Sequence, residues 1–253
     1  MNENKLYTKK QIRRKTIVSF CIFFVLAAGA VISWIYIKNM PPDNGLTGGL
    51  PVPVRTVLRA NEKIFDRTVG TQHLVKTYPV SAAVKIPRVN GDIGMNNDFD
   101  PTGWKLRVAK ANGDTLEVSL ADIKKLPKTE IVFDFKCIEG WNQVTHWAGV
   151  KFSDFAAAYH LDKETSLKYV GMATPDLDYY VGIDMPSALH PQTLLCYEMN
   201  NKPLPLNQGY PLRMIIPVKY GIKSIKRIGT LYFNDKRPPD YWAERGYDYY
   251  SGL

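Results

Sequence analysis

The sequence lacks the short motifs that mark several common classes of enzyme. It contains no glycine-rich phosphate loop followed by Lys-Ser or Lys-Thr, and no G-x-G-x-x-G fingerprint after a strand. It has no G-x-S-x-G nucleophile elbow, and its four histidines (His73, His146, His160 and His190) do not have the spacing of a zinc site. These absences argue against a P-loop nucleotidase, a dinucleotide-dependent dehydrogenase, an α/β-hydrolase and a zinc enzyme.

Cysteine is scarce as well, with three residues in a chain of 253. Cys21 lies inside an apolar run, and the other two, Cys137 and Cys196, are too few for the disulfide framework of a small secreted domain. Two roles stay open for this pair. Either they form one disulfide bond in an oxidising compartment, or Cys137 is a nucleophile with His146 as its base, although the sequence supplies no third group to orient that histidine.

Acidic residues are almost missing from the first 40 positions. Residues 1–40 contain seven lysines and arginines but only Glu3, so they account for +6 of a total net charge of +9. The other 213 residues carry only +3. Basicity that is confined to one end of the chain argues against a nucleic-acid-binding face.

A long uncharged run follows this basic leader, from Thr16 to Ile37. Its 22 residues are enough to span a bilayer as a helix, and the positive charge before it places residues 1–15 in the cytoplasm. We therefore expect a retained single-pass anchor at 16–37. The alternative is a cleaved signal peptide, because Ala28-Gly29-Ala30 resembles a cleavage site. Arg13-Arg14, directly before the run, matches part of a twin-arginine export signal.

Residues 38–84 are expected to form a linker and N-terminal extension, since prolines and glycines crowd positions 39–60.

Residues 85–253 show no repeat and no second core, which indicates one domain. Apolar and polar residues alternate on both sides of Asn112-Gly113-Asp114, which predicts a β-hairpin. Further expected elements are helices at Leu120–Leu126 (capped by Ser119) and Phe152–Leu161 (capped by Ser153), strands at Leu167–Thr174, Tyr179–Ile183, Leu212–Val218 and Ile228–Phe233, and a loop at Pro186–Met199 that runs into a helical segment.

The stretch Ile131–Trp141 combines a strand pattern with a cysteine. Ile131, Phe133 and Phe135 alternate with more polar positions, and Cys137 then enters a turn that contains glycine. A thiol at the end of a strand is held by a rigid element yet is reachable, which suits a metal ligand or a nucleophile. A cationic segment follows 80 to 90 residues later, with Arg213 on the strand expected before it, and contains Lys219, Lys223, Lys226 and Arg227. These side chains form either a clamp for an anionic group or a solvated basic loop.

Three blocks of sequence resemble the sulfite-oxidase-type molybdopterin oxidoreductases, and among these the periplasmic methionine-sulfoxide reductases. The first is Cys137-Ile-Glu-Gly-Trp141 with the downstream His146-Trp-Ala-Gly149, and the second leads from His190-Pro191 to Asn201-Lys-Pro-Leu-Pro-Leu. The third is the run from Gly209 to Lys226, and Tyr241–Tyr247 also fits. The resemblance covers residues 85–250. It implies an α+β, molybdopterin-binding fold of mixed, β-rich sheets with flanking helices, behind the N-terminal transmembrane helix.

The resemblance also implies roles for individual residues. Cys137 is expected to be the thiolate ligand of molybdenum, and Asn90 is an alternative to Asn96 as an N-terminal cofactor contact. The expected contacts to the molybdenum–molybdopterin cofactor are Asn96, Phe99, Asp100, Thr174, Gln208, Arg213, Ser224, Ile225 and Lys226. The expected lining of the substrate funnel is Trp141, Tyr220, Trp242 and Tyr247.

The activity implied is two-electron oxygen-atom transfer, reducing a small-molecule or protein S-oxide. The motif that begins at Cys137 lacks the arginine that follows the ligand cysteine in sulfite oxidases. A sulfite-oxidising enzyme of the same fold and a non-catalytic, disulfide-containing binding module tethered to the membrane remain alternatives. No haem motif is present, so electrons are expected from a membrane cytochrome or quinol-linked partner. A cofactor inserted in the cytoplasm requires export of a folded protein, which favours the twin-arginine reading and a catalytic domain on the periplasmic side.

Overall fold

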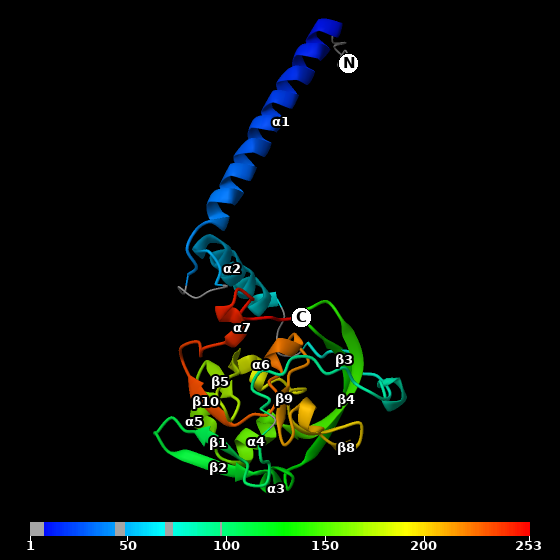
Figure 1. Ribbon diagram of the computed structural model, residues 1–253, viewed down its shortest axis with the longest axis vertical. Helices are drawn as coiled ribbons and strands as arrows, with labels where there is room; N and C mark the ends of the chain where they lie inside the picture. Colours follow the sequence, from blue (N-terminus) through cyan, green and yellow to red (C-terminus); the bar gives the residue numbers. More distant parts are fainter. Residues whose placement is uncertain (1–7, 44–48, 69–72, 97) are drawn as a thin grey trace, which may run out of the picture. The chain divides into compact units, whose positions relative to one another are not determined.

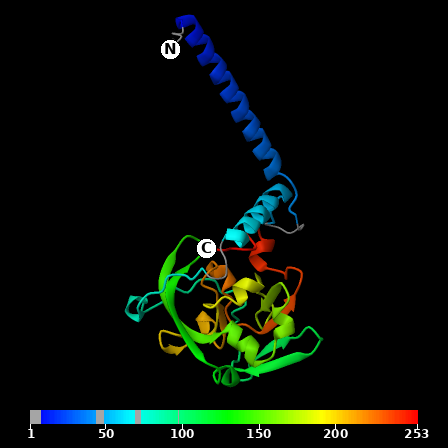
Figure 2. The same ribbon diagram turned by 180° about the vertical axis from the view of Figure 1, so that it is seen from behind.

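A computed structural model describes residues 8–43, 49–68, 73–96 and 98–253. The chain divides into two compact units, residues 1–59 and residues 60–253 (Figures 1 and 2). Part of the predicted basic leader, parts of the predicted linker and Asn97, which stands between the expected contacts Asn96 and Phe99, lie outside the described ranges.

The first unit begins with the helix α1, Lys9–Lys38. Thr8 and Gln11 form a reciprocal capping box at its N-terminus, and none of its residues is buried. A helix of 30 residues is about 45 Å long, so the predicted apolar run lies entirely within it. Among the described residues, α1 is the one helix long and apolar enough to cross a membrane, a test that a signal sequence near an N-terminus also passes.

The helix α2, Val52–Thr68, begins within positions 39–60, where the prolines and glycines indicated an extended linker without helix. The expectation was wrong there because Pro53 lies in the first helical turn, where its missing N–H costs no hydrogen bond. Before the helix, Pro42 pairs with Pro51 in an isolated β-bridge, and the backbone N–H of Asp43 donates to the carbonyl of Leu50 at 2.9 Å. The prolines therefore lie at a β-bridge and at the start of a helix.

One five-stranded sheet of the second unit has the order β2-β1-β10-β5-β6. The predicted hairpin is confirmed as β1 and β2, and β10 pairs with β1 in parallel and with β5 in antiparallel register. β10, the last strand of the chain, is therefore central. The bounds are β1 Lys105–Ala109, β2 Thr115–Ser119, β5 Tyr169–Ala173, β6 Tyr180–Asp184 and β10 Thr230–Asn234.

The other five-stranded sheet has the order β3-β4-β7-β8, with β9 also paired to β7. Its longest members, β3 and β4, form the curved hairpin drawn in green in Figures 1 and 2, and they pair from Lys128–Val150 to Lys136–Asn142. The bounds are β3 Lys128–Lys136, β4 Asn142–Lys151, β7 Leu194–Met199, β8 Lys202–Pro203 and β9 Arg213–Ile215.

The prediction of a loop leading into a helix over Pro186–Met199 was wrong, because β7 occupies its second half. Both faces of this strand are covered: Leu195 and Tyr197 point into the main core, whereas Leu194 and Cys196 point into a second cluster. A strand with two apolar faces shows no alternation of polar and apolar residues, so its period cannot be read from the sequence.

The remaining helices are short and connect or flank the strands. Ser119 caps α3 as expected, with its Oγ accepting from the backbone N–H of Asp122, but the N-cap of α4 is Lys151 and not Ser153. The bounds are η1 Val80–Ala82, α3 Leu120–Ile123, α4 Phe152–Ala158, α5 Asp162–Thr165, α6 Met185–Ala188, η2 Leu206–Gln208, η3 Gly221–Lys223 and α7 Tyr241–Glu244.

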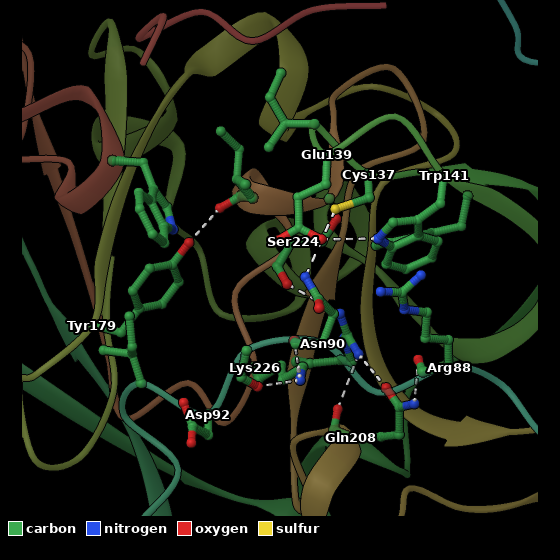
Figure 3. A pocket seen from close by; sticks show the side chains of 18 of the residues that line it. Arg88, Asn90, Asp92, Cys137, Glu139, Trp141, Tyr179, Gln208, Ser224 and Lys226 are labelled. Atoms are coloured by element: carbon green, nitrogen blue, oxygen red, sulfur yellow. Dashed lines mark hydrogen bonds between the residues drawn. The ribbon is translucent and has the colours of Figure 1, made fainter. Parts of the chain in front are cut away.

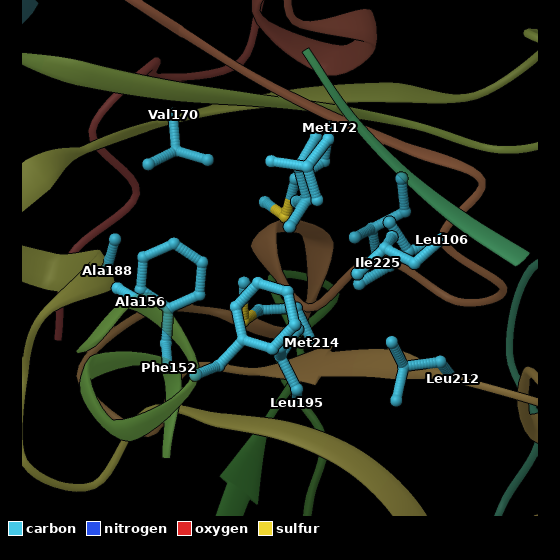
Figure 4. Packing of buried hydrophobic residues seen from close by; sticks show 14 of the residues in the cluster. Leu106, Phe152, Ala156, Val170, Met172, Ala188, Leu195, Leu212, Met214 and Ile225 are labelled. Carbon is cyan, nitrogen blue, oxygen red and sulfur yellow. The ribbon is translucent and has the colours of Figure 1, made fainter. Parts of the chain in front are cut away.

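The main core joins residues of both sheets with those of the short helices. Phe152 from α4 packs near Leu195 of β7 and Met214 of β9, and Val170 and Met172 of β5 face them from the other sheet (Figure 4). The fold is therefore of the expected α+β class, with mixed sheets flanked by helices.

Candidate functional site

A hairpin loop positions Cys137. Lys136 of β3 pairs with Asn142 of β4, which leaves five residues, from Cys137 to Trp141, to turn the chain. The backbone N–H of Cys137 donates to the carbonyl of Trp141 at 2.9 Å, and Gly140 adopts a φ of 90° that favours glycine. The thiol is thus attached to the longest hairpin of the second sheet.

The surroundings of Cys137 are partly buried and polar. Burial raises the pKa of the thiol, and the backbone N–H groups of Glu139 and Ile138 offset part of that effect. The side-chain amide of Asn90 lies 3.9 Å from Cys137 Sγ. Asn90 also binds the carboxylate of Glu139, whose other partner is the indole N–H of Trp141 at 3.2 Å. A thiol kept protonated by burial ionises when a cation approaches it.

Arg213 occupies a second part of the site and is almost fully buried. Its guanidinium donates to the backbone carbonyl and Oε1 of Gln208 at 3.0 and 3.1 Å and to the carbonyl of Ser224 at 3.1 Å. It also lies over the ring of Trp147, and burial lowers its pKa to about 10. Among the described residues no carboxylate pairs with Arg213, and its Nε has no hydrogen-bond partner.

Lys226 supplies a second cation held by neutral groups. Its ammonium donates to the backbone carbonyls of Asn90 and Gly91 at 2.7 and 2.8 Å. Burial, followed by the charge of Arg213, lowers the pKa of Lys226 to about 8. One buried and one half-buried cation without a carboxylate ion-pair partner in the described part of the chain favour an anionic ligand.

These groups line one cavity of about 340 Å³, shown from close by in Figure 3. This volume lies within the range of small-molecule and cofactor pockets. In Figure 3, Cys137, Glu139 and Trp141 lie in the upper part of the view, with Arg88 below the ring of Trp141. Lys226 lies in the lower part, on the same side as Asp92. The walls come mainly from residues 88–93, the β3–β4 hairpin, residues 208–226 and the C-terminal Trp242 and Tyr247, and Tyr179 and Met199 complete them.

The structure brings eight of the expected site residues into this cavity and leaves six outside its lining. Those in the lining are Cys137, Trp141, Gln208, Arg213, Ser224, Lys226, Trp242 and Tyr247. Those outside are Asn96, Phe99, Asp100, Thr174, Tyr220 and Ile225.

The outlying residues have recognisable structural partners. Ile225 is fully buried in the main core, and the Thr174 hydroxyl donates to Asp176 at 2.6 Å. Phe99 lies against the Arg227 guanidinium, and Asp100 accepts from Thr102. Asn96 lines a neighbouring, more open pocket that shares Asp92 and Ile93 with the cavity. Gly94 follows these two shared residues in the chain, and a Cβ on it would lie 2.6 Å from the Thr174 side chain, so Thr174 packs closely against the loop that carries them.

Several cavity residues were missed by the sequence interpretation. Arg88, Asp92, Glu139 and Tyr179 all line the cavity, and so does Asn90, which the sequence offered only as an alternative contact. Glu139 lay inside the recognised motif, and the polar turn around Asn90 was a signal for close approach to a ligand. No local pattern singled out Arg88 or Tyr179.

The two other roles considered for Cys137 do not fit the geometry. Cys137 and Cys196 are both free thiols, and Cys196 is buried on β7, where its Sγ donates to the carbonyl of Ala148. His146 pairs with Val132 across the hairpin, five residues along β3 from Cys137, and its Nε2 lies 3.1 Å from a carboxylate oxygen of Glu130. Five strand residues span about 16 Å, so His146 is not a base for Cys137.

The residues present fit a cofactor that joins a soft metal to an anionic tail. Cys137 offers the thiolate that softer metals prefer, and the unsatisfied Nε of Arg213 and the Lys226 ammonium offer contacts to an anion. The described residues contain no group of three histidine, cysteine or acidic side chains able to hold a metal ion by themselves. A metal at Cys137 would therefore need most of its ligands from the cofactor.

Comparison with known proteins indicates the same class of cofactor. A family model described as an oxidoreductase molybdopterin binding domain matches residues 93–242. A putative protein-methionine-sulfoxide reductase subunit YedZ1 of Azospira oryzae is 33% identical over 196 residues, covering 77% of this chain and 74% of that protein.

Two protein-methionine-sulfoxide reductase catalytic subunits, both called MsrP, are also similar. The protein of Campylobacter jejuni is 32% identical and covers 64% of this chain, and that of Ralstonia nicotianae is 31% identical and covers 70%. The chain spans 60% and 64% of their respective lengths. Among solved structures, the sulfane dehydrogenase SoxCD of Paracoccus pantotrophus has a TM-score of 0.49 at 17% identity, over 55% of this chain and 40% of that one.

Proposed function

The chain belongs to the molybdopterin-binding oxidoreductase family, and on that premise we propose that it is a membrane-anchored reductase of S-oxides with a cysteine-ligated molybdenum centre. The observation that carries the proposal is the cavity that holds the Cys137 thiol together with Arg213 and Lys226. The methionine-sulfoxide reductases among its relatives favour a methionine sulfoxide, free or within a protein, as substrate.

In this proposal the chain's own residues bind and orient. Cys137 would hold the metal, while Arg213, Gln208, Ser224 and Lys226 would hold the pterin and its phosphate. When bound, the molybdenum cofactor supplies two-electron oxygen-atom transfer. Trp141, Trp242 and Tyr247 line the cavity with aromatic surface, which would exclude water and leave room for a thioether side chain.

Reduction of an S-oxide to a thioether and water consumes two electrons and two protons. The chain therefore needs an electron donor, and α1 would keep it at the membrane beside a cytochrome or quinol-linked protein. The proposed organisation is a cytoplasmic leader at 1–15, an anchor at 16–37, an extension at 38–84, and a periplasmic catalytic domain at 85–253, exported after folding through the Arg13-Arg14 signal.

The metal content of a matched pair of variants tests the centre. Protein is produced in a host that makes the cofactor, and molybdenum per chain is measured for wild type, Cys137→Ser and Cys196→Ser. We expect molybdenum in wild type and in Cys196→Ser, because a serine hydroxyl can also donate to the Ala148 carbonyl, and loss of molybdenum in Cys137→Ser. Equal molybdenum in both variants would contradict the ligand assignment.

Substrate and direction are tested with the loaded enzyme and an artificial electron donor. We expect methionine sulfoxide to be reduced, and no comparable oxidation of sulfite with an electron acceptor. A higher kcat/KM for sulfite oxidation than for S-oxide reduction would favour the sulfite-oxidising alternative.

A further inference from the structure

The helix α2 exposes its apolar side. Val57 and Ile64, seven residues apart and therefore on one face, are 59% and 58% exposed, and Val54 and Leu58 on the same side are only half-buried. A helix of a globular protein normally turns such a stripe toward the core. In α2 the stripe is left accessible.

The polar side of α2 is the side that makes contacts. Arg55 is buried and pairs with Asp43 at 3.1 Å. Glu62, seven residues further on, is only 13% exposed and pairs with Arg237 at 2.5 Å. The helix is thus fixed through its charged face, so its apolar face does not turn inward.

The N-terminus of α2 lies close to the end of α1. Four residues lead from Lys38 to Pro42, which pairs directly with Pro51 at the start of α2. Four extended residues and one strand-to-strand spacing limit the separation of the two helix ends to about 20 Å. If α1 spans the bilayer, with Trp34 and Tyr36 near its far surface, α2 starts within the reach of that surface.

We propose that α2 is an interfacial helix that lays Val57 and Ile64 into the outer surface of the bilayer, with anionic lipid headgroups beside it. The exposed Lys63 would meet the phosphate groups of those lipids, whereas Arg59, about 200° around the helix from Val57 and 3.9 Å from Asp43, would stay on the water side. Lipid is favoured over a protein partner because the helix follows α1 so closely in the chain. The inference rests on the proposed anchorage by α1.

Spin-label accessibility measures the position of α2 in the full-length, cofactor-loaded protein. Single cysteines are introduced in a Cys21→Ala background as Val57→Cys, Ile64→Cys, Arg59→Cys and Val25→Cys, and the proteins are placed in vesicles of phosphatidylcholine and phosphatidylglycerol. Accessibility to oxygen, which concentrates in lipid, is compared with accessibility to a water-soluble nickel complex. The Cys21→Ala parent must take up negligible label, and each variant must keep the molybdenum content of wild type.

We expect the oxygen-to-nickel accessibility ratio to be several-fold higher at positions 57 and 64 than at position 59. Position 25 in the middle of α1 should have the highest ratio. Ratios at 57 and 64 that equal the ratio at 59, with position 25 still in lipid, would overturn the inference and leave the anchorage intact. Low accessibility to both reagents at 57 and 64 would also overturn it, in favour of a protein partner or a second copy. A nickel-accessible position 25 would refute the anchorage, and the inference with it, while molybdenum content reports separately on the catalytic proposal.

Discussion

Lys226 and Arg213 both bring positive charge to the cavity, but only Lys226 can lose its charge near neutral pH. The guanidinium of Arg213 keeps a pKa of about 10 despite its burial, whereas the pKa of Lys226 is about 8. Anion binding at Lys226 needs the protonated ammonium, so its contribution is complete well below pH 8 and is lost as the pH rises through that value.

The affinity of cofactor-free protein for inorganic phosphate should therefore fall between pH 7.5 and pH 9.5. A charged hydrogen bond contributes about 1.5–3 kcal/mol, so Lys226→Met should weaken binding about tenfold or more at pH 7.5. The same variant should show little further pH dependence, because the titrating group is gone. Titration calorimetry checks both statements, with Lys163→Met at an exposed position as the control. Equal pH dependence in wild type and Lys226→Met would contradict the assignment.

At the scale of elements, Gly149 fixes how closely β4 and β7 approach. A Cβ at this position would lie 2.0 Å from the carbonyl oxygen of Leu195, a backbone atom that cannot move without disturbing the pairing. Gly149→Ala should therefore destabilise the second sheet by about 1–3 kcal/mol or more. Gly103→Ala, where a Cβ meets nothing within 4 Å, is the matched control. Thermal unfolding in detergent measures the difference. Equal unfolding midpoints for the two variants would show that β4 and β7 can move apart enough to accommodate the added methyl group.

Elements with a local signal could be predicted from the sequence, and those fixed by distant contacts could not. The β1–β2 hairpin and the Cys137 loop follow from turn residues and alternation within a few positions. By contrast, Arg88 reaches the cavity because its backbone N–H donates to Gln143, and Asn90 because its carbonyl accepts from Lys226. Those contacts join segments 55 and 136 residues apart, so no short pattern reveals them.

At the scale of the whole molecule, the proposed topology puts the two ends of α1 on opposite sides of the membrane. Ile86 is 91% exposed in the second unit, and Thr8 is exposed at the N-cap of α1. In bacterial spheroplasts, a membrane-impermeant maleimide should label Ile86→Cys directly but Thr8→Cys only after lysis, because the basic leader stays inside. Labelling of Ile86→Cys only after lysis would reverse the orientation.

The central place of β10 has a consequence for how the protein is made. β1 and β5 do not pair with each other; both pair with β10, a strand that is synthesised after every other one. The first sheet cannot assemble while translation is under way, and Trp242 and Tyr247 of the cavity wall emerge later still. The first sheet can therefore close only after β10 has emerged from the ribosome.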